Sequence, residues 1–342
     1  MASRKFGSMP DGADIVEVSL AGGDLSVKVI NFGAVIRDVR LAGIARPLVL
    51  GFDRLDDYLR HSPHFGAVAG RCANRIAGGR LMIDGRRHQL SLNENGRTHL
   101  HGGFKGFGVR AWRILAQDAA SVTLAISAED GEEGYPGRVD AVCRYTVEPP
   151  ATIRIEFEAT TNAPTIVNLA QHSYFNLSGD DTILDHRVMI RADDYTPFDQ
   201  DKIPTGAILP VAGTLFDFRE LRPIRRTNGA SRFEYDINYV VAEARAAAPR
   251  PVARLESPSG DVALDVASTE PGLQFYDGCM MKEIPVPGLD GRRYGLNAGC
   301  CFEPQVFPDS PNHPGFPSAI LRPGETYRQT TLFSFGRVAN SE

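Results

Sequence analysis

The stretch Thr152-Ile153-Arg154-Ile155-Glu156-Phe157-Glu158-Ala159 decides the fold class of this 342-residue chain. Its apolar residues, Ile153, Ile155, Phe157 and Ala159, alternate one by one with polar residues. Successive side chains of a β-strand point to opposite faces, so this alternation predicts a strand with one buried face and one solvated face.

The same kind of signal recurs along the chain, so strands are the dominant predicted element. Asp84-Gly85 predicts a tight hairpin over 81–90, because this pair supports the positive φ angles of a type I′ turn. Pro258-Ser259-Gly260 predicts a second hairpin over 252–268. Further strands are expected at Leu25–Ile30, Ser121–Ser127, Ala141–Val147, Arg187–Arg191 and Thr326–Phe335.

Helical signals are few and short. Asp53–Arg60 predicts a short helix capped by Asp53, and the Ala-rich run Glu243–Ala248 is stopped by Pro249 and Pro251. Strands do not alternate with long amphipathic helices, which disfavours a doubly wound parallel sheet. We therefore expect an all-β fold of antiparallel strands with few short helices. The chain shows no repeat or Gly/Ser linker, so one sandwich domain is expected over residues 1–342.

Composition and charge exclude several classes of protein. The formal net charge is −5, and no basic stripe of a nucleic-acid-binding protein is present. The basic run Arg219–Arg226 is interpreted as a solvated loop. No apolar stretch is long enough to cross a bilayer, and residues 1–11 lack the apolar core of a signal peptide. The five cysteines include no C-x-x-C pair, which predicts reduced thiols in a cytoplasmic protein.

Motifs for nucleotide cofactors and for serine hydrolysis are missing from the sequence. It contains no G-x-x-x-x-G-K-[ST] loop, no strand-G-x-G-x-x-G-helix unit and no G-x-S-x-G elbow. The Gly-rich stretch 102–108 has no Lys-Ser/Thr ending and no following helix, so it does not predict a phosphate site.

Two segments carry polar groups that could bind a ligand. In Gly70–Ala77, Arg75 could hold sugar hydroxyls, because a planar guanidinium offers several donors; a surface ion pair is the alternative. In Thr98–Gly103, strand geometry would place His99 and His101 on one face. No acidic or thiolate third ligand lies nearby, which disfavours a metal site. A ligand-binding histidine and a structural histidine both remain open.

Two further segments suggest acid–base chemistry in a cleft. In 168–177, strand parity puts Asn168, His172, Tyr174 and Asn176 on one face, which suits a carbohydrate cleft or a solvated outer face. Glu303 lies in an otherwise apolar run with cysteines and phenylalanines around it. Burial there would raise the pKa of Glu303 towards the range that a catalytic carboxyl needs.

Taken together, these segments resemble the aldose 1-epimerase family, also called the galactose mutarotases. The similarity spans roughly 33–335, and its specificity comes from several motifs in the family's order. They are GRCANRIA at 70–77, LHGG at 100–103, HSYFNL at 172–177, PTGAILPVAGTLFDF at 204–218, QFY at 274–276, EPQ at 303–305 and LRPGE at 321–325.

The resemblance implies a large antiparallel β-supersandwich with an open sugar-binding cleft and no metal or organic cofactor. It implies that His172 is the general acid and Glu303 the general base in opening and reclosing the sugar ring. The substrate is expected to be a free monosaccharide, bound by a monomer or homodimer. The residues implied in binding sugar hydroxyls are Asn74, Arg75, His101, Asp236 and Gln274.

Three departures from the family's pattern leave the preferred sugar open. Ala170 stands where the family often has Thr, Asp236-Ile237-Asn238-Tyr239 replaces D-H-N-F, and Asp277 replaces a usual Thr.

Other readings of the same residues remain possible from sequence. A glycoside hydrolase would use two carboxylates, with Asp236 as the partner of Glu303. A non-catalytic sugar-binding module is a second alternative. An epimerase of hexose 6-phosphates is a third, although Arg71 and Arg75 are the only candidates for a basic phosphate pocket.

Overall fold

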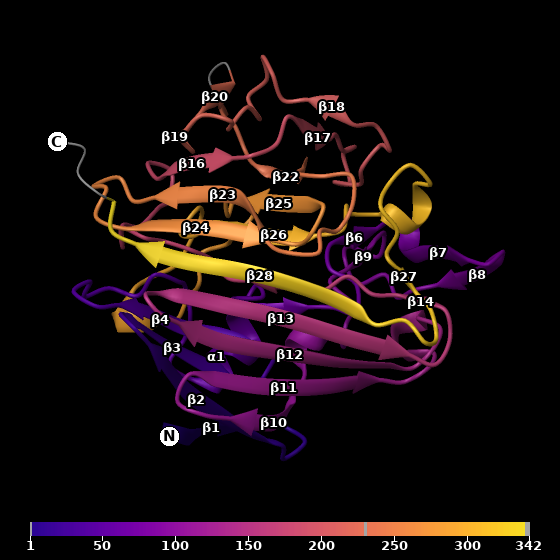
Figure 1. Ribbon diagram of the computed structural model, residues 1–342, viewed down its shortest axis with the longest axis horizontal. Coiled ribbons are helices and arrows are strands. Elements are labelled where there is room, and N and C mark those ends of the chain that lie inside the picture. Colours follow the sequence, from indigo (N-terminus) through magenta and orange to yellow (C-terminus); the bar gives the residue numbers. More distant parts are fainter. Residues whose placement is uncertain (1, 229–230, 339–342) are drawn as a thin grey trace.

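The computed structural model describes residues 2–228 and 231–338. A nine-stranded sheet crosses the molecule, and all its strand pairs are antiparallel (Figure 1). In spatial order the strands are β10 (Arg113–Gln117), β11 (Ser121–Ala128), β12 (Val139–Glu148), β13 (Thr152–Thr161), β28 (Tyr327–Gly336), β24 (Ala263–Ser268), β23 (Arg250–Glu256), β16 (Arg187–Ile190) and β19 (Arg222–Pro223).

The centre of this sheet confirms the strand that was predicted from alternation. Strand β13 buries Ile153, Ile155, Phe157 and Ala159, while the residues between them are at least partly exposed. Strand β28 pairs with β13 on one side and with β24 on the other. Among the described strands, β28 is therefore the one whose hydrogen bonds join the two halves of the sheet: β10 to β13 on one side, and β24, β23, β16 and β19 on the other.

Two smaller antiparallel sheets lie behind the large sheet in Figure 1. The first contains β1 (Ala2–Ser8), β2 (Asp14–Gly22), β3 (Leu25–Ile30) and β4 (Val35–Leu41) in that order. The second contains β18 (Leu209–Pro210), β17 (Asp194–Thr196), β22 (Asp236–Val240), β25 (Gly272–Tyr276) and β26 (Cys301–Gln305) in that order.

Short two-stranded pairs complete the strand arrangement. They are β5 (Ala67–Ala69) with β15 (Ala170–His172), β6 (Arg75–Ile76) with β9 (His99–Leu100), β7 (Arg80–Ile83) with β8 (Arg86–Gln89), β14 (Thr165–Ile166) with β27 (Ile320–Leu321), and β20 (Thr227–Asn228) with β21 (Ser231–Arg232). The predicted hairpin at Asp84-Gly85 is confirmed, because Ile83 pairs with Arg86 across a two-residue turn.

A common apolar core joins the three large sheets. Val27 of β3, Ile155 of β13 and Phe275 of β25 are almost completely buried and belong to one cluster. Since each sheet contributes one apolar face to the same core, the arrangement is a sandwich of antiparallel sheets. The predicted all-β fold class is therefore confirmed.

Helices are few, as expected, but one detail of the prediction was wrong. Helix α1 (Leu55–His61) begins after Arg54 without a side-chain cap, and Asp53 instead binds Arg37. Residues 243–248 form no helix.

No helix among the described residues has the length and apolar character that crossing a bilayer requires. The 3₁₀ helices are η1 (Ala77–Gly79), η2 (Phe107–Val109), η3 (Glu132–Gly134), η4 (Leu289–Gly291) and η5 (Ser310–Asn312).

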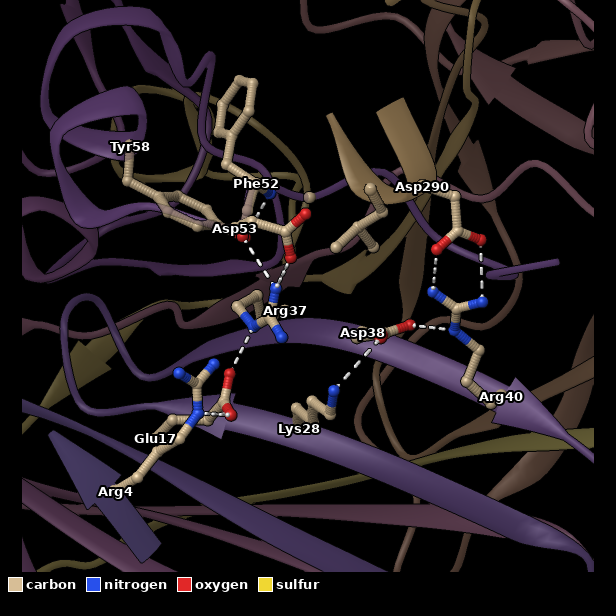
Figure 2. Close-up of polar contacts among 12 residues, drawn as sticks. Arg4, Glu17, Lys28, Arg37, Asp38, Arg40, Phe52, Asp53, Tyr58 and Asp290 are labelled. Carbon is tan, nitrogen blue, oxygen red and sulfur yellow. Dashed lines mark hydrogen bonds and ion pairs between the residues drawn. The ribbon is translucent and has the colours of Figure 1, made fainter. Parts of the chain in front are cut away.

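Arg37 on β4 ties the N-terminal sheet to the segment that precedes α1 (Figure 2). Its guanidinium lies 2.6 Å from the Glu17 carboxylate and 2.9 Å from Asp53, and it donates to the Phe52 carbonyl oxygen at 2.9 Å. Arg37 and Glu17 are both buried, so the pair fixes the path of the chain towards α1 and the loop after it.

All five cysteines are buried and free, in agreement with the predicted reduced thiols.

Candidate active site

A cavity of about 540 Å³ is lined by most of the residues that the sequence predicted to bind sugar. Its volume is within the range of small-molecule sites. The predicted residues that line it are Asn74, Arg75, His101, His172, Asp236 and Glu303. Gln274 lies behind the wall, where its side-chain amide donates to the Asp236 carboxylate at 2.7 Å.

Two strands hold His172 and Glu303 against each other. His172 ends β15, which pairs with β5, and Glu303 is the central residue of β26, directly opposite Gln274 on β25. The Nε2 atom of His172 lies 3.7 Å from Oε1 of Glu303. This separation exceeds a hydrogen bond, and both side chains face the same cavity.

Burial shifts the two pKa values in opposite directions. It raises the pKa of Glu303 to about 8, with a further increase from the negative charge of Asp236 and an opposing effect of Arg75. It lowers the pKa of His172 to about 3, with a smaller contribution from His64. With these shifts the pair carries one proton at neutral pH. The raised pKa of Glu303 agrees with the expectation from the apolar residues around it in the sequence.

A buried charged cluster lies next to Glu303. Arg75 donates to both carboxylate oxygens of Glu94 at 2.8 Å and to Asp236 at 3.4 Å. The side chain of Arg75 is only 7 % exposed, so the surface ion pair considered from sequence is wrong. The cluster presents donors and acceptors at fixed positions on the cavity wall, which suits vicinal hydroxyl groups.

His101 contributes a hydrogen-bond donor to the same cavity. The backbone N–H of Asn74 donates to Nδ1 of His101 at 3.2 Å, so the proton of the neutral ring is on Nε2. His101, His172 and Glu303 could otherwise hold a metal ion, because their ligand atoms lie within 4.8 Å of one another. A ring nitrogen that carries a proton cannot ligate a metal, so the hydrogen-bonding of His101 does not fit a metal site.

Three residues of the cavity adopt left-handed backbone conformations. The φ angles are +69° for His64, +65° for Asn74 and +50° for His101. Such conformations cost energy for residues other than glycine and gather at functional sites.

The structure corrects the expectation that His99 and His101 share a strand face. Strand β9 ends at Leu100, and the left-handed conformation of His101 breaks the strand alternation, so that the His101 side chain lines the cavity. His99 is buried elsewhere, with Nε2 2.6 Å from the Tyr135 hydroxyl. His99 is therefore a structural histidine, and His101 is the residue that faces the cavity.

Arg71 and two asparagines form hydrogen bonds with main-chain groups and do not line the cavity. Arg71 is buried and donates to the carbonyl oxygens of Pro136 and Gly137, so it cannot hold a phosphate in this cavity. Asn168 bonds the backbone of Val306, and Asn176 donates to the carbonyl oxygen of Ala298. The predicted polar row is wrong at these two asparagines. His172 and Tyr174 do line the cavity, as that prediction expected.

Several cavity residues have no signal in the sequence. Among them are His64 and Glu94, and also Arg60, His61 and Met280–Pro285.

The basic run Arg219–Arg226 is only partly the solvated loop expected. Arg222 packs over the Phe218 ring at 3.5 Å from its centroid and donates to the backbone carbonyl oxygens of Leu215, Asp217 and Pro223.

Comparison with known proteins identifies the family of this chain. The family model for aldose 1-epimerase matches residues 17–334. Galactose mutarotase from Rattus norvegicus is 38% identical over 341 residues, covering 96% of this chain and 97% of the relative. Aldose 1-epimerase from Escherichia coli K12 is 34% identical over 343 residues, covering 95% and 96%.

Solved structures show the same fold. An aldose epimerase homologue from C. elegans superposes with a TM-score of 0.87 at 29% identity, covering 94% of this chain and 99% of that one. Galactose 1-epimerase from Lactobacillus acidophilus NCFM gives 0.83 at 26% identity, covering 98% of both chains. This chain therefore belongs to the aldose 1-epimerase family and is an isomerase.

Proposed function

We propose that this protein interconverts the α and β anomers of a free aldose, with Glu303 as the base and His172 as the acid. The observation that carries the proposal is the buried pair at 3.7 Å, with both groups facing a cavity of sugar size. Opening a hemiacetal requires one proton acceptor at the O1 hydroxyl and one donor at the ring oxygen.

The reaction is balanced by the two side chains. Glu303 takes the proton of O1 while His172 donates a proton to the ring oxygen, and the bond between C1 and the ring oxygen breaks to give the open-chain aldehyde. Rotation about C1–C2 presents the other carbonyl face. The ring hydroxyl then attacks C1, and both proton transfers run in reverse. No redox change occurs, so the proposal includes no cofactor.

One proton on the pair is the requirement for this chemistry. Whichever of the two side chains holds the proton, the pair offers one donor and one acceptor. The two protonation states interconvert by transfer of one proton between Glu303 and His172. The positive charge of Arg75 lowers the pKa of Glu303 and so favours the state in which Glu303 is ionised and can act as the base.

The charged cluster supports the assigned sugar-binding roles. Asn74, Arg75, His101 and Asp236 contact the hydroxyl groups directly in this proposal. Gln274 acts through Asp236, whose carboxylate it orients at 2.7 Å.

The geometry argues against the competing activities. Asp236 already pairs with Arg75 and Gln274, so it is not a free second carboxyl for glycoside hydrolysis. Arg71 does not line the cavity, so the phosphate pocket of Arg71 and Arg75 considered from sequence is not formed. The proposed setting is a cytoplasmic monomer or homodimer that acts on a monosaccharide.

Polarimetry tests the proposal directly. Freshly dissolved α-D-galactose, α-D-glucose and L-arabinose are followed with and without protein, and the enzyme accelerates the change in rotation of at least one sugar. The glycosidase alternative requires release of the aryl group from an aryl galactoside, which the proposed enzyme does not catalyse. Absence of acceleration for all three sugars contradicts the proposal.

A further inference from the structure

His64 lines the catalytic cavity and has no role in the proton transfers described above. It belongs to the loop between α1 and β5. The centroid of its ring lies 4.9 Å from that of His101 and 5.8 Å from that of His172, with the His64 and His172 planes 21° apart. His64 is thus part of a group of three imidazoles.

The backbone around His64 is firmly held. The Tyr174 hydroxyl donates to the Pro63 carbonyl oxygen at 2.9 Å, and the amide of Ala67 donates to the carbonyl oxygen of His64 at 3.0 Å. His64 has a φ of +69°, which a residue other than glycine adopts at a cost. The ring is therefore kept in the cavity by fixed main-chain contacts.

The ring itself has no hydrogen-bond partner among residues 2–228 and 231–338. Burial lowers the pKa of His64 to about 4, so the ring is neutral at physiological pH. A neutral imidazole has one N–H donor and one nitrogen acceptor, and a sugar hydroxyl can satisfy either. The cavity side of His64 is consequently suited to a hydroxyl group.

The neighbours of His64 indicate which hydroxyl this is. The ring of His64 stacks on the ring of His172, with 5.8 Å between the centroids. His64 therefore lies beside the residue that serves the ring oxygen in the proposed function. With O1 at Glu303 and the ring oxygen at His172, the next ring atom beyond that oxygen is C5.

We infer that His64 binds the hydroxyl group of the substituent on C5 and makes this enzyme favour aldohexoses over 6-deoxy sugars and pentoses. The inference rests on the proposed function, because the orientation of the sugar follows from the roles of Glu303 and His172.

The test compares three sugars that share the galactose ring configuration. D-galactose has the 6-hydroxyl, D-fucose lacks only that hydroxyl, and L-arabinose lacks the whole C5 substituent. In the unmodified protein we expect kcat/KM to be higher for D-galactose than for D-fucose. In His64→Phe, which keeps an aromatic ring, kcat/KM for D-galactose falls between about threefold and tenfold, as for loss of one neutral hydrogen bond. The values for D-fucose and L-arabinose stay within about twofold by the same reasoning.

Two further variants separate binding from folding. His64→Gln retains a donor and an acceptor and restores part of the preference for D-galactose. His88→Phe makes the same replacement on β8, outside the cavity, and leaves all three values unchanged. Thermal unfolding checks that each variant is folded.

The outcomes distinguish the two claims. A galactose-to-fucose ratio that is equal in the unmodified protein and in both His64 variants overturns the inference, while mutarotation itself persists. If the unmodified protein accelerates none of the sugars, the proposed function fails before the role of His64 is reached.

Discussion

The Nε2 atom of His172 and the Oε1 atom of Glu303 lie 3.7 Å apart, on strands that belong to different sheets. Burial lowers the pKa of the imidazole and raises the pKa of the carboxyl, so a single proton is retained by the pair across the neutral range. The pair thus supplies both a proton donor and a proton acceptor, one from each side chain.

Removing either member of the pair should abolish most of the catalysis. We expect Glu303→Gln and His172→Asn each to lower kcat by about 10²- to 10⁴-fold, the usual contribution of general acid–base catalysis. Polarimetry with D-galactose measures the loss. A variant that keeps nearly unmodified kcat excludes its residue from the proposed role.

The pH profile of kcat/KM should be bell-shaped and unusually broad. The alkaline limb is expected near pH 8, where Glu303 loses the one proton of the pair. The acidic limb is expected well below pH 6.5, because the lowered pKa of His172 delays the addition of a second proton. Rates corrected for spontaneous mutarotation give the profile. An acidic limb at the ordinary histidine value contradicts the burial effect.

Glu303→Gln should stabilise the fold in a pH-dependent way. The folded-state pKa of Glu303 is raised from 4.5 to about 8, so the associated stability is fully present below pH 4.5 and is lost as pH rises through 8. Gln does not titrate, and a shift from 4.5 to about 8 at about 1.4 kcal/mol per pKa unit gives the variant an advantage of at most about 5 kcal/mol above pH 8. Urea unfolding at pH 5 and pH 8.5 measures it. Glu220→Gln, at an exposed position, serves as the control and shows no such difference.

Arg75→Ala should raise KM more than it lowers kcat, because Arg75 touches the sugar hydroxyls in the proposed complex. It should also move the alkaline limb to higher pH, since Arg75 opposes the raised pKa of Glu303. Steady-state kinetics between pH 6 and pH 10 test both effects. Arg97→Ala removes an exposed arginine paired with Asp201 and is the control. A large loss of kcat at constant KM would instead place Arg75 in the chemical step.

Arg37→Met should destabilise the fold through the pair shown in Figure 2. The variant leaves the carboxylate of Glu17 buried with only the exposed Arg4 beside it, and such a loss costs about 3–5 kcal/mol. The double variant Glu17→Gln/Arg37→Met should recover much of this. Lys28→Met removes an exposed lysine that lies 3.9 Å from the buried Asp38 carboxylate. Arg40 still binds that carboxylate at 2.7 Å, so the change should cost less than about 1 kcal/mol. Urea denaturation ranks the three.

The sequence predicts the strands well where one face is buried and the other is solvated. Strand β13 and the hairpin at Asp84-Gly85 are examples, because alternation and turn chemistry are local properties. The raised pKa of Glu303 also follows from its apolar neighbours in the chain. The predicted cap at Asp53 was wrong because the Asp53 carboxylate binds Arg37, which lies on another element.

The positions of the site residues are harder to predict from neighbouring residues in the sequence. Strand parity failed at His101, Asn168 and Asn176 because β9 and β15 are only two and three residues long and the chain turns beside them. His64 carries no local signal at all, since its position depends on a loop that contacts β15. The sequence-based roles of the seven site residues remain predictions that the experiments above address.

The position of β28 has a consequence for how the chain folds. Residues 113–161 and 187–268 can each form hydrogen-bonded strands early, but the bridge between them requires residues 327–336. Contacts of such large sequence separation form slowly, because much loop-closure entropy must be overcome first. During synthesis, the edges of β13 and β24 stay unpaired until that late segment leaves the ribosome, so a chaperone that shields strand edges would act within this interval.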